Sequence, residues 1–252
     1  VLVFDSDGNL KNSWDSGVLE GHGMTIAREG DTEYLWIADN GVKNTKEKGY
    51  KSMPEGKAGQ VVKMTLDGRR VLSLRPPDLP VYRQGQYNPT WVTVNEEQYG
   101  GNGDVWVADG YGSYYVHRYG KDGEYINSIN GEEGSAGRFD QPHAVFIDRR
   151  KPDPELYIAD RSNRRVQVYD LYGKFKRAFG SDYLTSPSVF ITYGGVMVIG
   201  ELNASLVVID SHDRYICSLG ENESVCEVDG WPNSKDTNGE TIASVLLEAG
   251  KF

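Results

Sequence analysis

One strand plan recurs along this chain and constrains its fold more than any other feature. An apolar strand is followed by a second strand, a third strand, and a fourth strand after a polar turn. The second strand ends on an Ala-Asp element in Leu35–Asp39, Val105–Asp109 and Leu156–Asp160, and Val196–Gly200 is a weaker copy. Four short antiparallel strands repeating at about 40 to 50 residues are typical of a β-propeller blade. The sequence therefore predicts an all-β propeller with four complete blades.

The repeat also predicts boundaries within a single propeller domain that covers residues 1–252. The first segment matches the third and fourth strands of a blade, so we expect a half-blade there and a ring that is incomplete within one chain. The last segment holds no further strand set and is expected to be an irregular tail. The predicted parts are a half-blade at 1–20, blades at 21–86, 87–139, 140–184 and 185–220, and a tail at 221–252.

The surfaces of such an open ring bear on its partners. Uncovered blades expose apolar faces and unpaired strand edges, so we expect a homo-oligomer or a strand-exchanged assembly in which the tail takes part. The net charge of −10 argues against a nucleic-acid partner, which needs clustered cations. No apolar run approaches the roughly 20 residues of a membrane-spanning helix, so no membrane partner is expected. Cys217 and Cys226 could clip a loop, but two cysteines leave the compartment open, with a secreted or periplasmic location favoured.

Two histidines occupy the same position in the repeat. His22 and His143 open the first strands of the first and third blades, where Thr90 and Ser188 stand in the other two. The first strand of each blade lines the channel of a propeller, so two imidazoles can approach one axis. Neutral imidazole is a common zinc ligand, which makes a channel metal site one interpretation. The alternative is that each histidine only makes a hydrogen bond at the start of its strand.

Two further candidates follow the Ala-Asp elements. Tyr111 could act as a general base if a nearby cation or metal lowered the pKa of its hydroxyl. Arg161 could bind a carboxylate through two parallel hydrogen bonds. The alternatives are aromatic packing for Tyr111 and a turn-facing cation for Arg161.

The other conspicuous polar residues are predicted to be structural. The repeated aspartates Asp39, Asp109 and Asp160 suit the capping of turn amides. His117 on a third strand and His212 in a turn are likewise expected to have structural roles.

The Ala-Asp element resembles the NHL repeat. Between Pro89 and Gly180 the motifs Pro-Thr-x-Val-x-Val, Asp-Gly-Tyr, Pro-His and Ala-Asp-Arg follow one another as in peptidyl-alpha-hydroxyglycine alpha-amidating lyases, whose catalytic domain the chain resembles. The resemblance implies a six-bladed propeller with a channel zinc held by three histidines and a structural calcium nearby. It implies that His22 and His143 are zinc ligands, that Tyr111 is the base and that Arg161 lies in the active site. The implied reaction splits a peptidyl-alpha-hydroxyglycine into a peptide amide and glyoxylate.

The sequence also departs from that family. The third histidine and an aspartate near the calcium would follow Phe252, and a further arginine would precede Val1. Gly112 and Leu156 stand where the family has cysteines, so its disulfides are not expected. We therefore expect weak zinc binding and a small-molecule or peptide-like substrate. Two alternatives stay open: a non-catalytic NHL-type binding or scaffold propeller, and an esterase-like or lactonase-like hydrolase that uses the same channel.

Overall fold

The computed structural model describes residues 1–41, 59–202 and 205–220. The chain divides into two compact units, Val1–Asn130 and Gly131–Phe252, each described here by itself. Nearly all regular structure is β-strand, which confirms the predicted all-β class. The predicted tail and most of the loop between Asn40 and Gly59 lie outside the described residues, as does Cys226. In the part of the chain that the structure describes, no helix is long and apolar enough to span a membrane.

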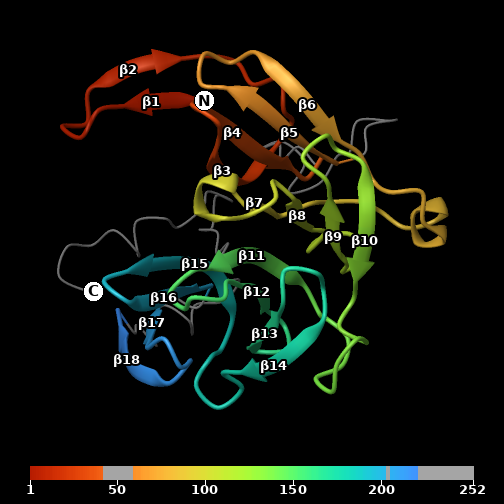
Figure 1. Cartoon of the computed structure of the whole chain (residues 1–252), viewed down its shortest axis with the longest axis vertical. Coiled ribbons are helices and arrows are strands. Elements are labelled where there is room, and N and C mark those ends of the chain that lie inside the picture. Colours follow the sequence, from red (N-terminus) through yellow and green to blue (C-terminus); the bar gives the residue numbers. More distant parts are fainter. Residues whose placement is uncertain (42–58, 203–204, 221–252) are drawn as a thin grey trace, which may run out of the picture. The chain divides into compact units, whose positions relative to one another are not determined.

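The first unit contains a strand pair and two four-stranded blades (Figure 1). The pair is the predicted half-blade, β1 (Leu2–Phe4) with β2 (Leu10–Ser13). The short 3-10 helices are η2 (Pro80–Arg83), before the second blade, and η3 (Glu97–Tyr99), within it. Strands in each blade follow one another in chain order and are antiparallel. The first blade comprises β3 (Gly21–Glu29), β4 (Thr32–Asp39), β5 (Gln60–Thr65) and β6 (Arg70–Leu74), and the second comprises β7 (Trp91–Val94), β8 (Val105–Ala108), β9 (Val116–Tyr119) and β10 (Tyr125–Ile129).

The second unit contains two more blades with the same strand order. The described residues thus form four complete blades, as the repeat predicts, rather than the six that the resemblance implies. That residues 1–252 form one domain stays a prediction. The third blade comprises β11 (Pro142–Asp148), β12 (Glu155–Asp160), β13 (Arg165–Tyr169) and β14 (Phe175–Phe179), and the fourth comprises β15 (Pro187–Tyr193), β16 (Val196–Glu201), β17 (Leu206–Ile209) and β18 (Tyr215–Leu219).

The second strand of each blade forms the centre of its core. The apolar run of β4 from Leu35 to Ala38 is buried throughout, because both faces of the sheet are covered. Trp36, Trp106 and Tyr157 occupy one position of the repeat and are each 0% exposed. Each of these three blades therefore buries a large aromatic side chain at the same position of its second strand.

The turn between the third and fourth strands has one backbone requirement. Its last residue adopts a left-handed conformation, with φ of 93° at Gly68, 90° at Gly123 and 95° at Gly173. Glycine meets this requirement without a steric penalty, and it follows an aspartate in the first two blades and Tyr172 in the third. In the fourth blade Asp213 takes the position, with φ of 63°.

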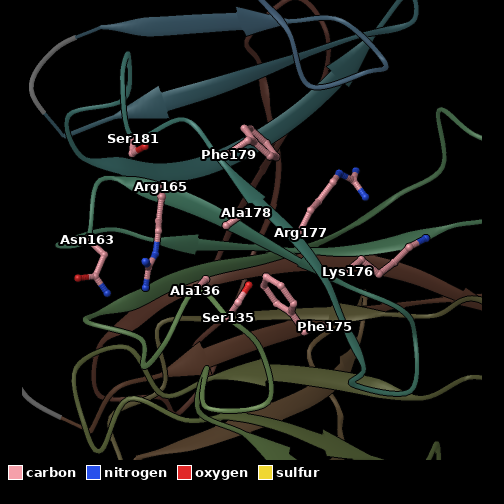
Figure 2. Close-up of a pocket in the computed structure, with 10 residues that line it drawn as sticks. All are labelled: Ser135, Ala136, Asn163, Arg165, Phe175, Lys176, Arg177, Ala178, Phe179 and Ser181. Carbon is pink, nitrogen blue, oxygen red and sulfur yellow. The ribbon is translucent and has the colours of Figure 1, made fainter.

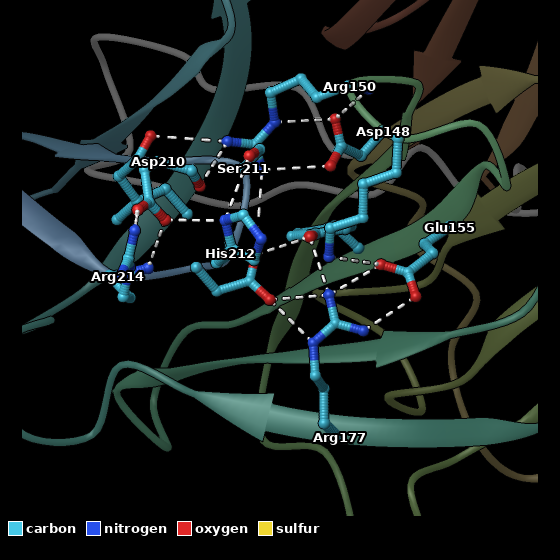
Figure 3. A network of polar contacts seen from close by, with 12 residues as sticks. Asp148, Arg150, Glu155, Arg177, Asp210, Ser211, His212 and Arg214 are labelled. Atoms are coloured by element: carbon cyan, nitrogen blue, oxygen red, sulfur yellow. Dashed lines mark hydrogen bonds and ion pairs between the residues drawn. The ribbon is translucent and has the colours of Figure 1, made fainter.

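A network of charges that includes Arg177 and Glu155 links the third and fourth blades (Figure 3), and Asp213 pairs with Arg177 in it. The guanidinium of Arg177 donates to both oxygens of Glu155, at 2.8 and 2.7 Å, and to Oδ2 of Asp213, at 2.7 Å. The Tyr157 hydroxyl donates to Oδ1 of Asp213 at 2.6 Å. Glycine could supply none of these contacts, which accounts for the aspartate in a turn position that otherwise favours glycine.

Candidate functional site

His22 sits in an irregularity of its strand. The register of β3 against β4 shifts between Gly21 and Met24, and such a bulge redirects the side chain that it carries. Nδ1 of His22 lies 3.0 Å from the backbone carbonyl of Thr90, which opens the next blade. A carbonyl only accepts hydrogen bonds, so Nδ1 carries the proton and the lone pair of neutral His22 lies on Nε2.

Tyr111 meets that lone pair. Its hydroxyl lies 3.2 Å from Nε2 of His22, and the two rings meet edge to face with centroids 5.0 Å apart. Because Nε2 is the accepting nitrogen, the Tyr111 hydroxyl is the donor. The side chain of Tyr111 is 38% exposed, so this hydroxyl lies beside solvent. Both residues were predicted as candidates from the sequence. Their contact, which joins positions 89 apart in the chain, was not predicted.

The turn that carries Tyr111 is fastened by Asp109. The carboxylate of Asp109 accepts the backbone amides of Asn88 and Ser113, each at 2.7 Å. The amide of Tyr111 donates to the carbonyl of Asn88 at 3.3 Å. The predicted capping role of the repeated aspartates is therefore confirmed here. Asp39 and Asp160 act in the same way, through the amides of Leu19, Glu20 and Gly41 and of Asp140 respectively.

A glycine beside His22 permits the close approach of β3 to the next blade. A Cβ at Gly23 would overlap the carbonyl oxygen of Thr90 and lie 2.8 Å from Cε3 of Trp91. Both contacts involve the segment whose Thr90 carbonyl binds His22. The glycine is therefore part of how the sequence places His22.

We expect Gly23→Ala to destabilise the protein by about 1 to 3 kcal/mol, as overpacking does in other tight sites. Urea unfolding at neutral pH measures the loss. Gly21→Ala is the matched control, because its Cβ would meet only Ile37 at 3.3 Å and Val18 at 3.7 Å. Equal losses in the two variants would contradict the packing argument.

In the second unit, His143 repeats the geometry of His22. It lies in the corresponding bulge of β11, and its Nδ1 donates to the carbonyl of Ser188 at 2.9 Å. In both histidines Nδ1 therefore makes a hydrogen bond at the start of the strand, as the structural alternative predicted. The same bond places each lone pair on Nε2, the tautomer that a metal ligand or a base requires.

Arg161 contacts the side-chain amide of Gln141. Its Nη2 and Nε lie 2.9 and 3.3 Å from Oε1 of Gln141, and the residue is 8% exposed. A neutral partner leaves the charge of Arg161 uncompensated by this contact. Its role toward a carboxylate, and the assignment of His143 and Arg161 to one site with Tyr111, stay predictions.

The second unit also holds a surface pocket of about 390 Å³ along β14 (Figure 2). It contains none of the predicted site residues. Its cations are already engaged: Arg165 pairs with Asp160 at 2.7 Å, and Arg177 and Lys176 pair with Glu155. We therefore infer no anion site there.

The metal site that the resemblance implies requires several donor side chains that come together. Among the described residues, no three side chains of His, Cys, Asp or Glu come together as metal ligands. Catalytic zinc sites use three protein ligands and keep one position open. His22 and His143 have the right tautomer, but this donor set does not complete such a site. Zinc binding, and calcium binding in a complete ring, remain predictions of the resemblance.

We accordingly expect calorimetric zinc titration to give no tight one-to-one binding. Two imidazoles bind zinc much more weakly than three, and the neutral hydroxyls of Thr90 and Ser188 are poor substitutes. The variants His22→Ala and His143→Ala should titrate like the original protein. Stoichiometric binding that disappears in both variants would contradict this prediction.

The comparisons with known proteins agree with the blade architecture. No family model matches the chain. NHL repeat-containing protein 3 of Homo sapiens is 26% identical over 215 residues, which cover 81% of this chain and 56% of that protein. Peptidyl-alpha-hydroxyglycine alpha-amidating lyase 1 of Drosophila melanogaster is 27% identical over 194 residues, 71% of this chain and 31% of that protein.

Among solved structures, virginiamycin B lyase from Staphylococcus aureus superposes with a TM-score of 0.58 at 14% identity, over 86% of this chain and 61% of that one. This likeness supports the fold alone. The chain spans about half the length of the NHL repeat protein that it matches, at 56%. The chain is therefore a β-propeller with homology to NHL repeat proteins.

Proposed function

We propose that this propeller is a lyase that cleaves carbinolamides of the peptidyl-alpha-hydroxyglycine type, with His22 and Tyr111 as its acid–base pair. The observation that carries the proposal is the hydrogen bond from the Tyr111 hydroxyl to Nε2 of His22. Two relatives with amidating-lyase names support the substrate class. No step of the proposal passes through a metal.

The pair can move one proton in both directions. The substrate hydroxyl gives its proton to the oxygen of Tyr111 as the proton of Tyr111 passes to Nε2 of His22. The electron pair left on the substrate oxygen forms the carbonyl of glyoxylate, and the C–N bond breaks with its electrons going to nitrogen. The proton then returns from His22 through Tyr111 to that nitrogen, which gives the peptide amide. Atoms and electrons balance, and no oxidant or reductant is consumed.

The surroundings of the pair suit this exchange. When His22 takes the proton, the Thr90 carbonyl accepts from Nδ1 and stabilises the imidazolium. The partial exposure of Tyr111 lets a substrate hydroxyl reach the phenolic oxygen. General acid–base catalysis by such a positioned pair typically contributes about 10²- to 10⁴-fold in rate.

The direct test supplies a synthetic peptidyl-alpha-hydroxyglycine and measures glyoxylate and peptide amide. We expect equimolar release of both products above the rate in buffer alone. Release at the buffer rate would overturn the proposed activity. Hydrolysis of an ester or lactone by the same pair, without glyoxylate release, would assign the site to the hydrolase alternative.

A binding propeller is the second candidate. It is favoured by one observation, the 26% identity to NHL repeat-containing protein 3 over 81% of this chain. In that case the His22–Tyr111 contact only fastens β3 to the second blade. A protein that binds the hydroxyglycine peptide, or a peptide amide, without turnover would support this candidate.

A further inference from the structure

A chain of hydrogen bonds runs through the second blade to the carboxylate that fastens the Tyr111 turn. Oγ of Ser128 lies 2.7 Å from Nδ1 of His117, and Nε2 of His117 lies 2.6 Å from the hydroxyl of Tyr82. That hydroxyl donates to Oδ2 of Asp109 at 2.7 Å. The outer end reaches the surface, because the hydroxyl of Tyr125, which is 39% exposed, lies 2.9 Å from Oγ of Ser128.

The direction of the chain follows from the charge of Asp109. While the carboxylate is ionised, Tyr82 must donate to it, so Tyr82 accepts from Nε2–H of His117. Nδ1 of His117 then accepts from the hydroxyl of Ser128. When Asp109 is protonated every bond reverses, and each group is still paired. The chain therefore accommodates both protonation states and offers a buried carboxyl a path for a proton.

The corresponding aspartates of the other blades are held differently. Asp160 in the third blade pairs with the guanidinium of Arg165 at 2.7 Å. Asp39 in the first blade accepts three backbone amides and the side-chain amide of Gln60. The side-chain partner that the structure gives Asp109 is a hydroxyl, and no cation contacts its carboxylate among the described residues.

Burial without a cationic partner changes the pKa of the Asp109 carboxyl. It raises the pKa of Asp109 to about 7, against the lowering effect of its hydrogen bonds from Ser113, Tyr82 and Asn88. Burial also lowers the pKa of His117 to about 3, so the imidazole stays neutral as Asp109 titrates. Three other tyrosines that face the cluster have pKa values raised by burial and stay protonated; they are Tyr82 from η2, Tyr87 from the following loop and Tyr119 from β9. Tyr115 also stacks on the ring of His117, and Tyr125 contacts Ser128 at the outer end.

We propose that Asp109 is a positioning residue that acts as a proton-controlled latch on Tyr111. As a carboxylate it holds the amides of Asn88 and Ser113 and fixes the turn. When it takes a proton through the Ser128–His117–Tyr82 chain, the charge-assisted bonds to those amides weaken and Tyr111 loses its fixed place against His22. The effect on catalysis rests on the proposed lyase function, but the latch itself does not.

The space around the carboxylate supports its role in the turn. A Cβ at Gly112 would overlap Oδ1 of Asp109 and the carbonyl of Gln86, so the turn closes directly onto the charge. Loss of that charge therefore acts directly on the backbone of the turn.

The test follows the backbone amides of Ser113 and Asn88 by NMR while the pH of the whole protein is changed. We expect both resonances to move with one midpoint near neutral pH. In Tyr82→Phe the carboxylate loses a donor, so the midpoint should rise by about 1 pH unit, the effect of one hydrogen bond to a charged group. The matched control is Tyr169→Phe in the third blade, whose hydroxyl donates to Gln167 beside Asp160. It should leave the midpoint unchanged.

Two results would overturn the latch: amides of Ser113 and Asn88 that do not titrate between about pH 5 and 9, or an unchanged midpoint in Tyr82→Phe. If Tyr82→Phe does not fold, Asp109→Asn carries the test, because it should abolish the titration at both amides. The rate of glyoxylate release should decrease as the pH falls below the same midpoint. Titrating amides without any glyoxylate would refute the lyase and retain the latch, and glyoxylate release with silent amides would do the reverse.

Discussion

Replacing Tyr111 with phenylalanine is expected to reduce glyoxylate release by about 10²- to 10⁴-fold, the usual contribution of a positioned acid–base group. The variant keeps the ring that packs edge to face on His22 and removes only the hydroxyl that contacts Nε2. We expect kcat to fall more than KM rises, because the proton moves only in the transition state.

The control for this variant is Tyr193→Phe, which removes a hydroxyl from a tyrosine that is 81% exposed on β15. It should leave glyoxylate release unchanged. A Tyr111→Phe protein with full activity would show that the hydroxyl takes no part in the reaction and would end the role assigned to the pair.

Replacing Arg177 with methionine is expected to lower the free energy of unfolding by about 3 kcal/mol at pH 7, because two buried carboxylates lose their bonds to one guanidinium, although Lys176 and Arg150 still pair with them. Glu155 and Asp213 are 4% and 9% exposed, and both lose the same guanidinium. The figure lies at the low end for such pairs because the side chain of Arg177 is 31% exposed.

This loss should depend on pH in a defined direction. Burial alone would raise the pKa of Glu155, but hydrogen bonds from Arg177 and Lys176 outweigh it and lower the pKa from 4.5 to about 2. A carboxyl with a lowered pKa contributes stability above its ordinary pKa and loses it as the pH falls toward the lowered value. Urea unfolding should therefore show a difference between the two proteins that is full at pH 7 and shrinks between about pH 5 and pH 2.

Arg214→Met is the matched control, because Arg214 pairs with Asp210 while 75% exposed. Exposed pairs contribute little, so this variant should unfold almost like the original protein. If Arg177→Met were equally harmless, the link that we describe between the third and fourth blades would carry no stability.

The blade plan could be predicted from the sequence because each of its signals is local. A buried second strand reads as an unbroken apolar run, and a turn that needs a left-handed residue reads as Asp-Gly. The exception is physical: Asp213 stands in that turn because its carboxylate binds Arg177 and Tyr157, which no local pattern shows. The first strand of the first blade begins at Gly21, next to the predicted opening at His22, because pairing with Asp39 continues across the bulge.

The candidate site could be predicted only as separate residues. The repeat placed His22 and His143 at one position, and the structure gives both the same bond to the next blade. The contact between His22 and Tyr111 depends on a bulge that has no sequence signal, and on the path of the turn after Asp109, of which the sequence predicts only the capping. His117 was predicted to be structural, and its partner Tyr82 comes from η2, a segment outside the repeat.

The central claim is that His22 presents its Nε2 lone pair to the hydroxyl of Tyr111, and nitrogen NMR of the labelled histidine tests it most directly. His22→Gln identifies the resonances. We predict a neutral imidazole protonated on Nδ1, with an Nε2 signal that moves in Tyr111→Phe while the Nδ1 signal stays in place. A tautomer protonated on Nε2, or an Nε2 signal that is the same in both proteins, would contradict the account.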